Sequence, residues 1–346
     1  MKILILLGRN FGDAVIQKNN IENLIKNNKN ITFWLWCREE FKDILSFNKY
    51  SNVNYIYNSF PMGSSHKFKY KDVFLLLKNI KKLRKLRISY AIDFTSDFRE
   101  KILLALTSNK VISILWSNNH PMAKLTRPLN FIFTSKKFIF YKASSAKINI
   151  YNTYNLFYKF LSNLIGIQFI PNQQIQPFHP KSNKLKIGLS PFASLECNTW
   201  PIENWKLLIQ RLLESSRYEI FVYCDKSKRD LLRKELKGVK VNLISVGLKE
   251  FLTSFKTLDI SVSNDSFASH LACMYGIHNY VIYGANDHNL FNPPNSNKFF
   301  NDKTCKLYPC MNKSPCLKDG SIEKYNCINN IDYKTVFDKI CNDFLN

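Results

Sequence analysis

The sequence alternates short apolar runs with amphipathic stretches along most of its length. Five apolar runs in the first half are rich in β-branched, aromatic and leucine side chains, and cover residues 3–7, 31–36, 53–57, 90–94 and 111–115. Such runs are typical of buried strands. Helical patterns lie between them, one beginning near Asp13 and one covering residues 73–87. The strands recur every 20–30 residues or so, and this βα alternation predicts a parallel, doubly wound sheet.

The second half repeats the same alternation. Apolar runs at residues 185–190 and 219–223 predict two strands, and residues 259–294 read as a βαβ unit whose helix ends at Gly276. An amphipathic helix over residues 331–345 closes the chain. Between the halves, residues 171–184 are polar, rich in Pro and without periodicity, which is typical of a linker.

We therefore predict an α/β protein of two domains, residues 1–170 and 185–346, joined by the linker at 171–184. A chain of 346 residues with 45% hydrophobic side chains is long enough for two separate cores. The final helix is assigned to the second domain, with packing back on the first domain as an alternative.

The composition bears on the compartment in which the protein is expected to work. No apolar run approaches the ~18 residues of a transmembrane helix. The apolar run at residues 3–7 is too short for the core of a signal peptide, so we expect a cytoplasmic protein. In that setting the nine cysteines favour free thiols or a metal site over a disulfide framework.

The formal net charge of +24 is unevenly distributed. Residues 1–170 hold 27 Lys and Arg against 9 Asp and Glu, while the remaining residues hold 23 against 17. The first half is thus expected to face nucleic acid, an anionic membrane surface or a phosphorylated acceptor. A membrane is suggested by the basic helix at 73–87 and the basic, aromatic segment 136–142, although a solvated charged face explains the helix equally well. No recognised nucleic-acid motif accompanies the charge, so nucleic acid is disfavoured.

A candidate anion site lies within the βαβ unit. Asp265 and Ser266 follow an apolar strand and directly precede a helical pattern. In open α/β sheets ligands bind beyond the carboxyl ends of the strands, where the first N–H groups of a helix face an anion. The two residues predict a phosphate-binding turn, with an ordinary helix N-cap as the alternative.

This stretch resembles the signature of family-nine glycosyltransferases, the lipopolysaccharide heptosyltransferases, which runs roughly S-x-D-T-G-x-x-H-L-A-A-x-x-G-x-P-x-V-x-L-F-G. The matching residues are Ser263, Asp265, His270, Leu271, Ala272, Gly276, Val281, Tyr283 and Gly284. Phe267 replaces a glycine and Asn279 stands near the usual proline. The resemblance implies a GT-B architecture, with two Rossmann-like domains facing a central cleft. The first domain would bind the acceptor and the second the nucleotide-sugar.

Two further motifs extend the resemblance. Arg9 and the pair Gly12-Asp13 resemble the family's opening, in which the aspartate is the proposed general base. A carboxylate at a strand-to-helix turn suits that role, although Asp13 could also serve only to complement the helix dipole. Residues 191–201 resemble P-G-A-S-x-x-x-K-x-W-P, with Phe192 for the glycine and Asn198 for the lysine that would contact the donor diphosphate.

The resemblance also implies a set of binding residues. For the acceptor, they are Arg9, Lys136 and Lys137. For the donor, they are Ser190, Ser194, Asn198, Asp225, Val246, Asp265, Ser266, Phe267, Ala268 and His270. A turn cap is the alternative for Asp225, and a core position is the alternative for His270.

We expect inverting, metal-independent transfer of a heptose or related sugar, with ADP-heptose as donor and the phosphorylated lipopolysaccharide core as acceptor. The enzyme would act at the cytoplasmic face of the inner membrane as a peripheral protein. No Asp-x-Asp motif is present, and no cofactor is expected. The tail cysteines Cys305, Cys310, Cys316 and Cys327 are weak candidates for a structural metal. Alternatives are a protein O-heptosyltransferase and a degenerate fold that only binds anionic surfaces.

Overall fold

The computed structural model describes residues 1–60, 69–95, 97–116, 137–143, 148–171, 184–311, 313, 316 and 324–344. The chain divides into two compact units, Met1–Gln173 and Gln174–Asn346, and each is described here by itself. Of the predicted linker, residues 172–183 lie outside the described part of the chain. Among the described residues, no helix combines the length and apolar character that crossing a membrane requires.

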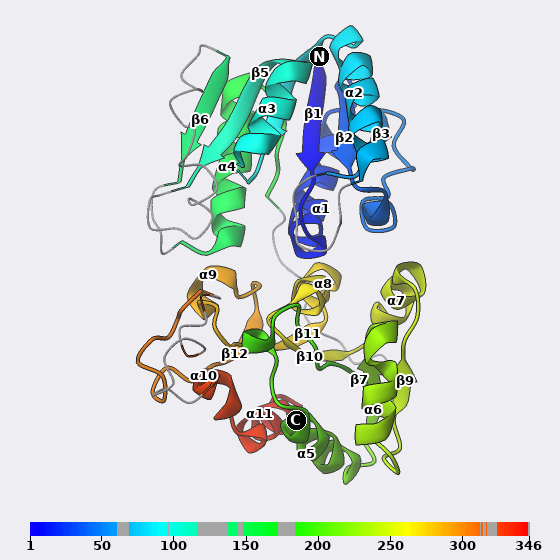
Figure 1. The fold of residues 1–346 in the computed structure, drawn as a ribbon, viewed down its shortest axis with the longest axis vertical. Helices are drawn as coiled ribbons and strands as arrows, with labels where there is room; N and C mark the ends of the chain where they lie inside the picture. Colours follow the sequence, from blue (N-terminus) through cyan, green and yellow to red (C-terminus); the bar gives the residue numbers. More distant parts are fainter. Residues whose placement is uncertain are drawn as a thin grey trace. The chain divides into compact units, whose positions relative to one another are not determined.

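The first unit is built on a six-stranded sheet in the order β3-β2-β1-β4-β5-β6 (Figure 1). Every neighbouring pair is parallel. The strands are β1 (Lys2–Leu7), β2 (Thr32–Cys37), β3 (Val53–Tyr57), β4 (Ile88–Asp93), β5 (Ser108–Leu115) and β6 (Phe138–Lys142). The strand order changes direction between β1 and β4, so the crevice at the carboxyl ends of these two strands is the expected ligand site.

Helices cover both faces of this sheet. The helices α2 (Tyr70–Lys85) and α3 (Phe98–Thr107) contact each other on one face, where Leu83 and Leu104 join the core with Leu4 and Leu6 of β1. On the other face α1 (Phe11–Asn27) contacts α4 (Ile150–Ile165). This arrangement explains why β1 is apolar almost throughout, because a strand covered on both faces has no solvent-facing side.

The basic, aromatic segment at 136–142 forms the edge strand β6. Phe138 packs against the hydrophobic core, and the Lys101 ammonium lies 5.1 Å from the centre of the Phe140 ring. The sequence suggested a membrane-facing segment here. In the structure, residues 138–142 form the edge strand of the sheet, and Phe138 packs against its core.

The second unit has a parallel six-stranded sheet in the order β12-β11-β10-β7-β8-β9. Its strands are β7 (Leu185–Ser190), β8 (Tyr218–Tyr223), β9 (Asn242–Ile244), β10 (Ile260–Asn264), β11 (His278–Ile282) and β12 (Ser296–Phe299). The order changes direction between β7 and β10. The candidate turn at Asp265 and Ser266 therefore leaves the sheet at its switch point.

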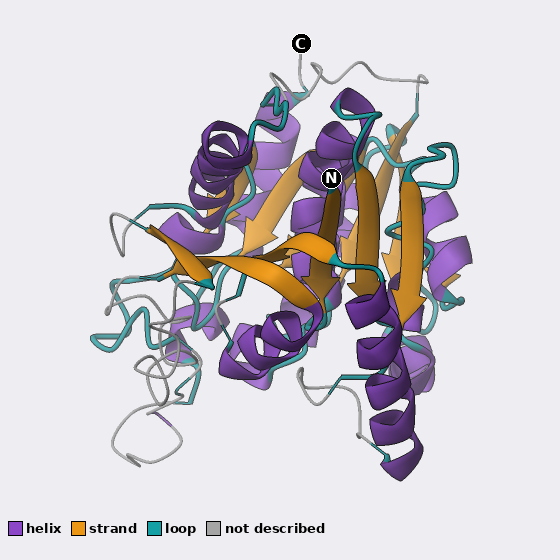
Figure 2. Cartoon of the chain, turned by 90° about the horizontal axis from the view of Figure 1, so that it is seen from above, coloured by secondary structure: helices purple, strands orange, loops and turns teal. Residues whose placement is uncertain are grey.

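Helices flank this sheet as well. Figure 2 shows the helices (purple) and strands (orange) of the chain from a second direction. Residues of α5 (Ile202–Leu213), α6 (Arg229–Glu235) and α11 (Tyr333–Asp343) share one core cluster with the sheet. On another side, α7 (Leu248–Phe255) and α8 (Phe267–Tyr275) meet through the rings of Phe251 and Phe267. The closing helix α11 packs against α5, and thus belongs to the second unit.

Candidate active site

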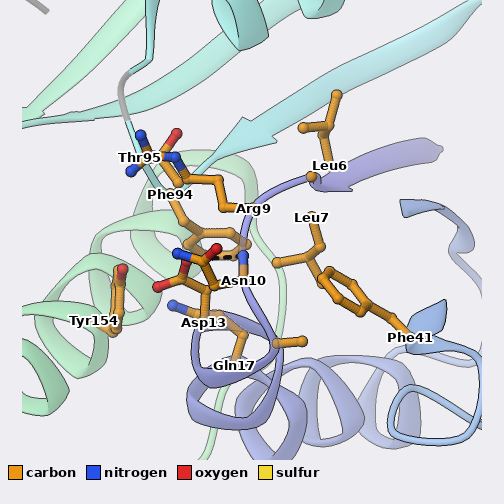
Figure 3. Close-up of a pocket in the computed structure, with 12 residues that line it drawn as sticks. Leu6, Leu7, Arg9, Asn10, Asp13, Gln17, Phe41, Phe94, Thr95 and Tyr154 are labelled. Atoms are coloured by element: carbon orange, nitrogen blue, oxygen red, sulfur yellow. Dashed lines mark hydrogen bonds between the residues drawn. The ribbon is translucent and has the colours of Figure 1, made fainter. Parts of the chain in front are cut away.

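A pocket opens at the switch point of the first unit (Figure 3). It is lined by the β1–α1 turn, the end of β4 and one side of α4, and its residues are Leu6, Leu7, Gly8, Arg9, Asn10, Asp13, Ala14, Gln17, Phe41, Phe94, Thr95 and Tyr154. Its apolar side chains include Leu6, Leu7, Phe41 and Phe94, and most of its polar groups come from the β1–α1 turn and from α1. The position agrees with the rule that ligands bind where the strand order reverses.

Asp13 is the carboxylate of this pocket. It occupies the third position of α1, which begins at Phe11, and its Oδ2 accepts the backbone N–H of Asn10 at 3.3 Å. Burial raises the pKa of Asp13, and the positive charge of Arg9 and the Asn10 hydrogen bond oppose that rise. A carboxylate with a raised pKa, held by one hydrogen bond in a pocket, is suited to accept a proton from a bound hydroxyl.

Arg9 is a fixed cation beside Asp13. Its Nη2 lies 3.4 Å from Oδ2 of Asp97, and Figure 3 shows its side chain extending toward Phe94 and Thr95. Asp97 is itself held in place, since it caps α3 through the Arg99 N–H and pairs with the Arg99 guanidinium at 2.7 Å. The cap of α3 thus orients Arg9 through Asp97.

Behind Arg9 lies a second, fully buried carboxyl group. Glu100 accepts the hydroxyl of Thr95 through Oε2, while Oε1 has no hydrogen-bond partner among the described residues. Burial and the neighbouring Asp93 raise the pKa of Glu100 well above its usual range. The raised pKa favours the protonated form of Glu100, which reduces the negative charge next to Arg9.

The second unit places Asp265 directly after β10. Its Oδ2 accepts a 2.6 Å hydrogen bond from the Asn286 amide, and its backbone N–H donates to Ile282 at 2.9 Å. Burial raises the pKa of Asp265 to about 6. The carboxyl group is therefore held between the exits of β10 and β11 and is ionised at neutral pH.

Ser266 is the N-cap of α8. Its carbonyl accepts the backbone N–H of Ser269 at 3.2 Å and the Ser269 hydroxyl at 2.7 Å. The side chain of Ser266 makes no capping hydrogen bond. The Ser266 hydroxyl and the first turn of α8 can therefore act together on an anion.

Two further groups lie at or near the exit of β7. The hydroxyl of Ser190 is buried without a hydrogen-bond partner among the described residues. The Lys228 ammonium, from the 3₁₀ turn η5 (Lys226–Lys228) after β8, lies 5.6 Å from the centre of the Phe192 ring. The Lys228 cation therefore lies close to Phe192 in the loop that follows β7, one of the two strands at the switch point of the second sheet.

Residues 166–323 match the family model of glycosyltransferase family 9 (heptosyltransferase). The chain carries a family 9 glycosyltransferase domain. No curated protein matches the chain in sequence.

Solved structures extend the likeness to the whole chain. E. coli heptosyltransferase WaaC with ADP is 17% identical, with a TM-score of 0.69 over 99% of this chain and 100% of that one. WaaC with ADP-2-deoxy-2-fluoro heptose is 14% identical, with a TM-score of 0.70 over 99% of this chain and 100% of that one. The family 9 glycosyl transferase of Veillonella parvula is 13% identical, with a TM-score of 0.69 over 99% of this chain and 97% of that one. These likenesses establish an α/β fold of the two-domain GT-B type, as predicted.

One matching position of the family signature, Gly284, and one departure from it, Asn198, have structural explanations. A Cβ atom on Gly284 would lie 2.0 Å from the carbonyl oxygen of Cys197, so the glycine permits close contact between two backbones. Asn198 is buried, and its Oδ1 accepts the N–H of Ala285 at 2.8 Å. The side chain that replaces the family's lysine therefore fastens the β7 loop to the β11 exit. Among the described residues, Lys228 lies near the ring of Phe192 in this loop, and Lys324 pairs with Glu196 of the same loop at 3.3 Å.

The other predicted donor residues are spread along the sheet. Ser194, Asp225 and Val246 are exposed in the segments that follow β7, β8 and β9. Ala268 and His270 are buried in α8, and burial lowers the pKa of His270 to about 4, so its ring is neutral at physiological pH. None of these residues contacts Asp265 through a hydrogen bond that the described part of the chain shows.

The predicted acceptor residues are only partly brought together. Arg9 lies in the pocket beside Asp13, as expected for an acceptor contact. Lys137 precedes β6, at the amino end of the strands and thus at the sheet edge opposite the pocket. Lys136 lies outside the described residues.

Sequence reasoning missed several site residues. Asn286 follows β11 and could have been found by applying the strand-exit rule to that strand. Gln17 and Tyr154 line the pocket from α1 and α4, where no motif marks them. Lys228 was hidden among the many exposed lysines of the chain.

The four tail cysteines lie near one another. Burial raises the pKa of Cys327 to about 12, and the charges of Cys305, Cys310 and Cys316 add to the rise. All nine cysteines of the chain are thiols in the structure. Within the described residues, no three His, Cys, Asp or Glu side chains are placed to hold a metal ion.

Proposed function

We propose that this glycosyltransferase moves a heptose from ADP-heptose to a phosphorylated lipopolysaccharide core acceptor, with inversion and without a metal ion. The glycosyltransferase class rests on the family 9 domain and on the fold. The donor is proposed because related structures hold ADP and ADP-2-deoxy-2-fluoro heptose. The observation that carries the mechanism is the half-buried Asp13 beside Arg9, at the switch point of the first sheet.

Asp13 acts as the general base in this proposal. The acceptor hydroxyl donates to the free side of the Asp13 carboxylate and loses its proton as the new glycosidic bond forms. Arg9 stabilises the carboxylate before transfer and attracts a phosphorylated acceptor to the pocket. Asp97 keeps the guanidinium in place.

The second unit holds the donor in this proposal. Asp265, fixed by Asn286, orients the sugar through its hydroxyl groups. Ser266 and the first turn of α8 bind the diphosphate, where the helix dipole favours the negative charge of the leaving group. Lys228 takes the place of the family's lysine as the cation near the diphosphate, since it stands over the β7 exit loop.

The uneven charge of the chain supports the choice of acceptor. Residues 1–170 carry 18 more basic than acidic residues (27 against 9), and this excess favours a phosphorylated acceptor at an anionic membrane. We propose that the enzyme works at the cytoplasmic face of the inner membrane as a peripheral protein.

Nucleotide selectivity tests the proposal. Titration of the protein with ADP, UDP, GDP and CMP, followed by thermal unfolding, is expected to show stabilisation by ADP alone, growing with concentration as mass action requires. Selective stabilisation by another nucleotide would overturn ADP-heptose as the donor. A protein that responds to no nucleotide would instead be a transferase fold that only binds anionic surfaces.

A further inference from the structure

The outward face of α2 is unusually apolar for an exposed helix. Tyr70, Phe74 and Leu77 are 97%, 82% and 59% exposed. Their spacing of four and three residues places them in one stripe, away from Leu83, which packs into the core. Three large apolar side chains in one exposed stripe form a continuous patch rather than scattered surface positions.

The same face becomes basic along the second half of the helix. Lys78, Lys81, Arg84 and Lys85 continue the outward stripe and are all exposed. The side chain of Lys82 reaches instead toward β2, with its ammonium 5.5 Å from the centre of the Trp34 ring. The outward face thus has an apolar half followed by a cationic half.

No acidic side chain of α2 compensates this charge. The single acidic residue of the helix is Asp72, which is buried and accepts the backbone N–H of Lys69 at 2.7 Å. An apolar stripe next to uncompensated lysine and arginine matches an anionic lipid surface, where apolar side chains enter the acyl boundary and cations meet headgroup phosphates.

We propose that the outward face of α2 is the surface by which the protein docks on an anionic bilayer, with Tyr70, Phe74 and Leu77 inserted among the lipids. The inference deepens the membrane location given under the proposed function by assigning it to one helix. The basic half attracts the protein to the surface, and the apolar half keeps it there after salt has screened the charges.

Vesicle co-sedimentation of the full chain tests this assignment. The probe is vesicles of equal parts phosphatidylglycerol and phosphatidylethanolamine, with phosphatidylcholine vesicles as the neutral control. We expect the wild type to bind only the anionic vesicles, and the double variant Phe74→Ser, Leu77→Ser to bind roughly tenfold or more weakly. Both side chains are exposed, so the folded state should retain the wild-type thermal stability.

Leu231→Ser is the matched control, because Leu231 is an exposed leucine on α6 and should leave vesicle binding unchanged. Wild-type binding by the double variant would overturn the proposal, as would a wild type that binds neither vesicle. A double variant that turns a dimer into a monomer, measured by sedimentation velocity, would instead make this face a contact between two copies.

Transfer to a deacylated, water-soluble acceptor separates this inference from the proposed function. The double variant should retain wild-type transfer in that assay, since α2 contributes no residue to the pocket. Loss of transfer together with normal vesicle binding would overturn the assignment of α2 as a docking helix. Absence of transfer by the wild type, with vesicle binding as expected, would contradict the proposed function alone.

Discussion

Asp13 carries the proposed chemistry at the residue scale, and its replacement by Asn is the first test. The Asn oxygen can still accept the Asn10 N–H, so the β1–α1 turn should be preserved. Loss of the base is expected to lower kcat about 10²–10⁴-fold while the affinity for ADP stays constant. Steady-state kinetics with a calorimetric ADP titration measures both. A variant with wild-type kcat would remove Asp13 from the mechanism.

Asp265 predicts a pH dependence of stability. Its pKa is raised to about 6 in the folded state, so the stability it contributes is complete below the unfolded pKa of about 3.9 and is lost as the pH rises through 6. Asp265→Asn removes this loss. Between pH 5 and 7.5, urea unfolding should show the variant gaining about 1–2 kcal/mol relative to the wild type. A constant difference across this range would contradict the burial of an ionisable group at this position.

Lys228 gives a third prediction at this scale. Lys228→Gln should weaken ADP binding about tenfold, because the lost cation interacts with a diphosphate, and should leave adenosine binding unchanged. Lys226→Gln is the matched control, since it removes the same charge from the same turn. Equal ADP affinity in the two variants would mean that Lys228 makes no specific phosphate contact.

At the scale of elements, the packing of the β7 and β11 exits predicts a stability effect. Gly284→Ala would bring a Cβ atom against the backbone of Cys197 and should destabilise the protein by about 2–3 kcal/mol. In Gly247→Ala the new Cβ would meet only the end of the flexible Glu250 side chain, so a loss below about 1 kcal/mol is expected. Urea unfolding of both variants tests this. Similar losses would show that the two loops can separate without cost.

The elements themselves were mostly accessible from the sequence. The apolar runs at 53–57 and 185–190 coincide with β3 and β7. β7 lies inside its sheet and is buried along almost its whole length, which requires apolar side chains. The edge strand β6 was missed because its aromatic and basic residues resemble a surface segment. The helix α1 begins at Phe11, two residues before the predicted start, and Asn10 is its N-cap residue.

The site residues, too, were only partly predictable from the sequence. Asp13 and Asp265 were found because each follows an apolar strand along the chain and lies in a motif that resembles the family's. Tyr154 comes from α4, far along the chain from β1, and only folding brings it to the pocket. Asn198 illustrates the opposite case, since its place in a binding motif predicted a ligand contact and the structure shows a hydrogen bond to Ala285.

At the scale of the whole molecule, the two units have the same sheet topology. Each sheet has six parallel strands, and the strand order changes direction at the middle of the sheet. A half-buried aspartate with a raised pKa lies at each of these two points. The two carboxylates have different neighbours, Arg9 for Asp13 and Asn286 for Asp265. This difference supports different roles, with proton transfer assigned to the first unit and sugar binding to the second.

Direct transfer of the sugar is the measurement that tests this account most closely. Purified protein would be incubated with ADP-heptose and heptose-free, phosphorylated lipopolysaccharide, and the acceptor analysed by mass spectrometry. The account predicts an acceptor heavier by one heptose with the wild type, and an unmodified acceptor with Asp13→Asn. An unmodified acceptor with the wild type, under conditions where ADP-heptose binds, would contradict it.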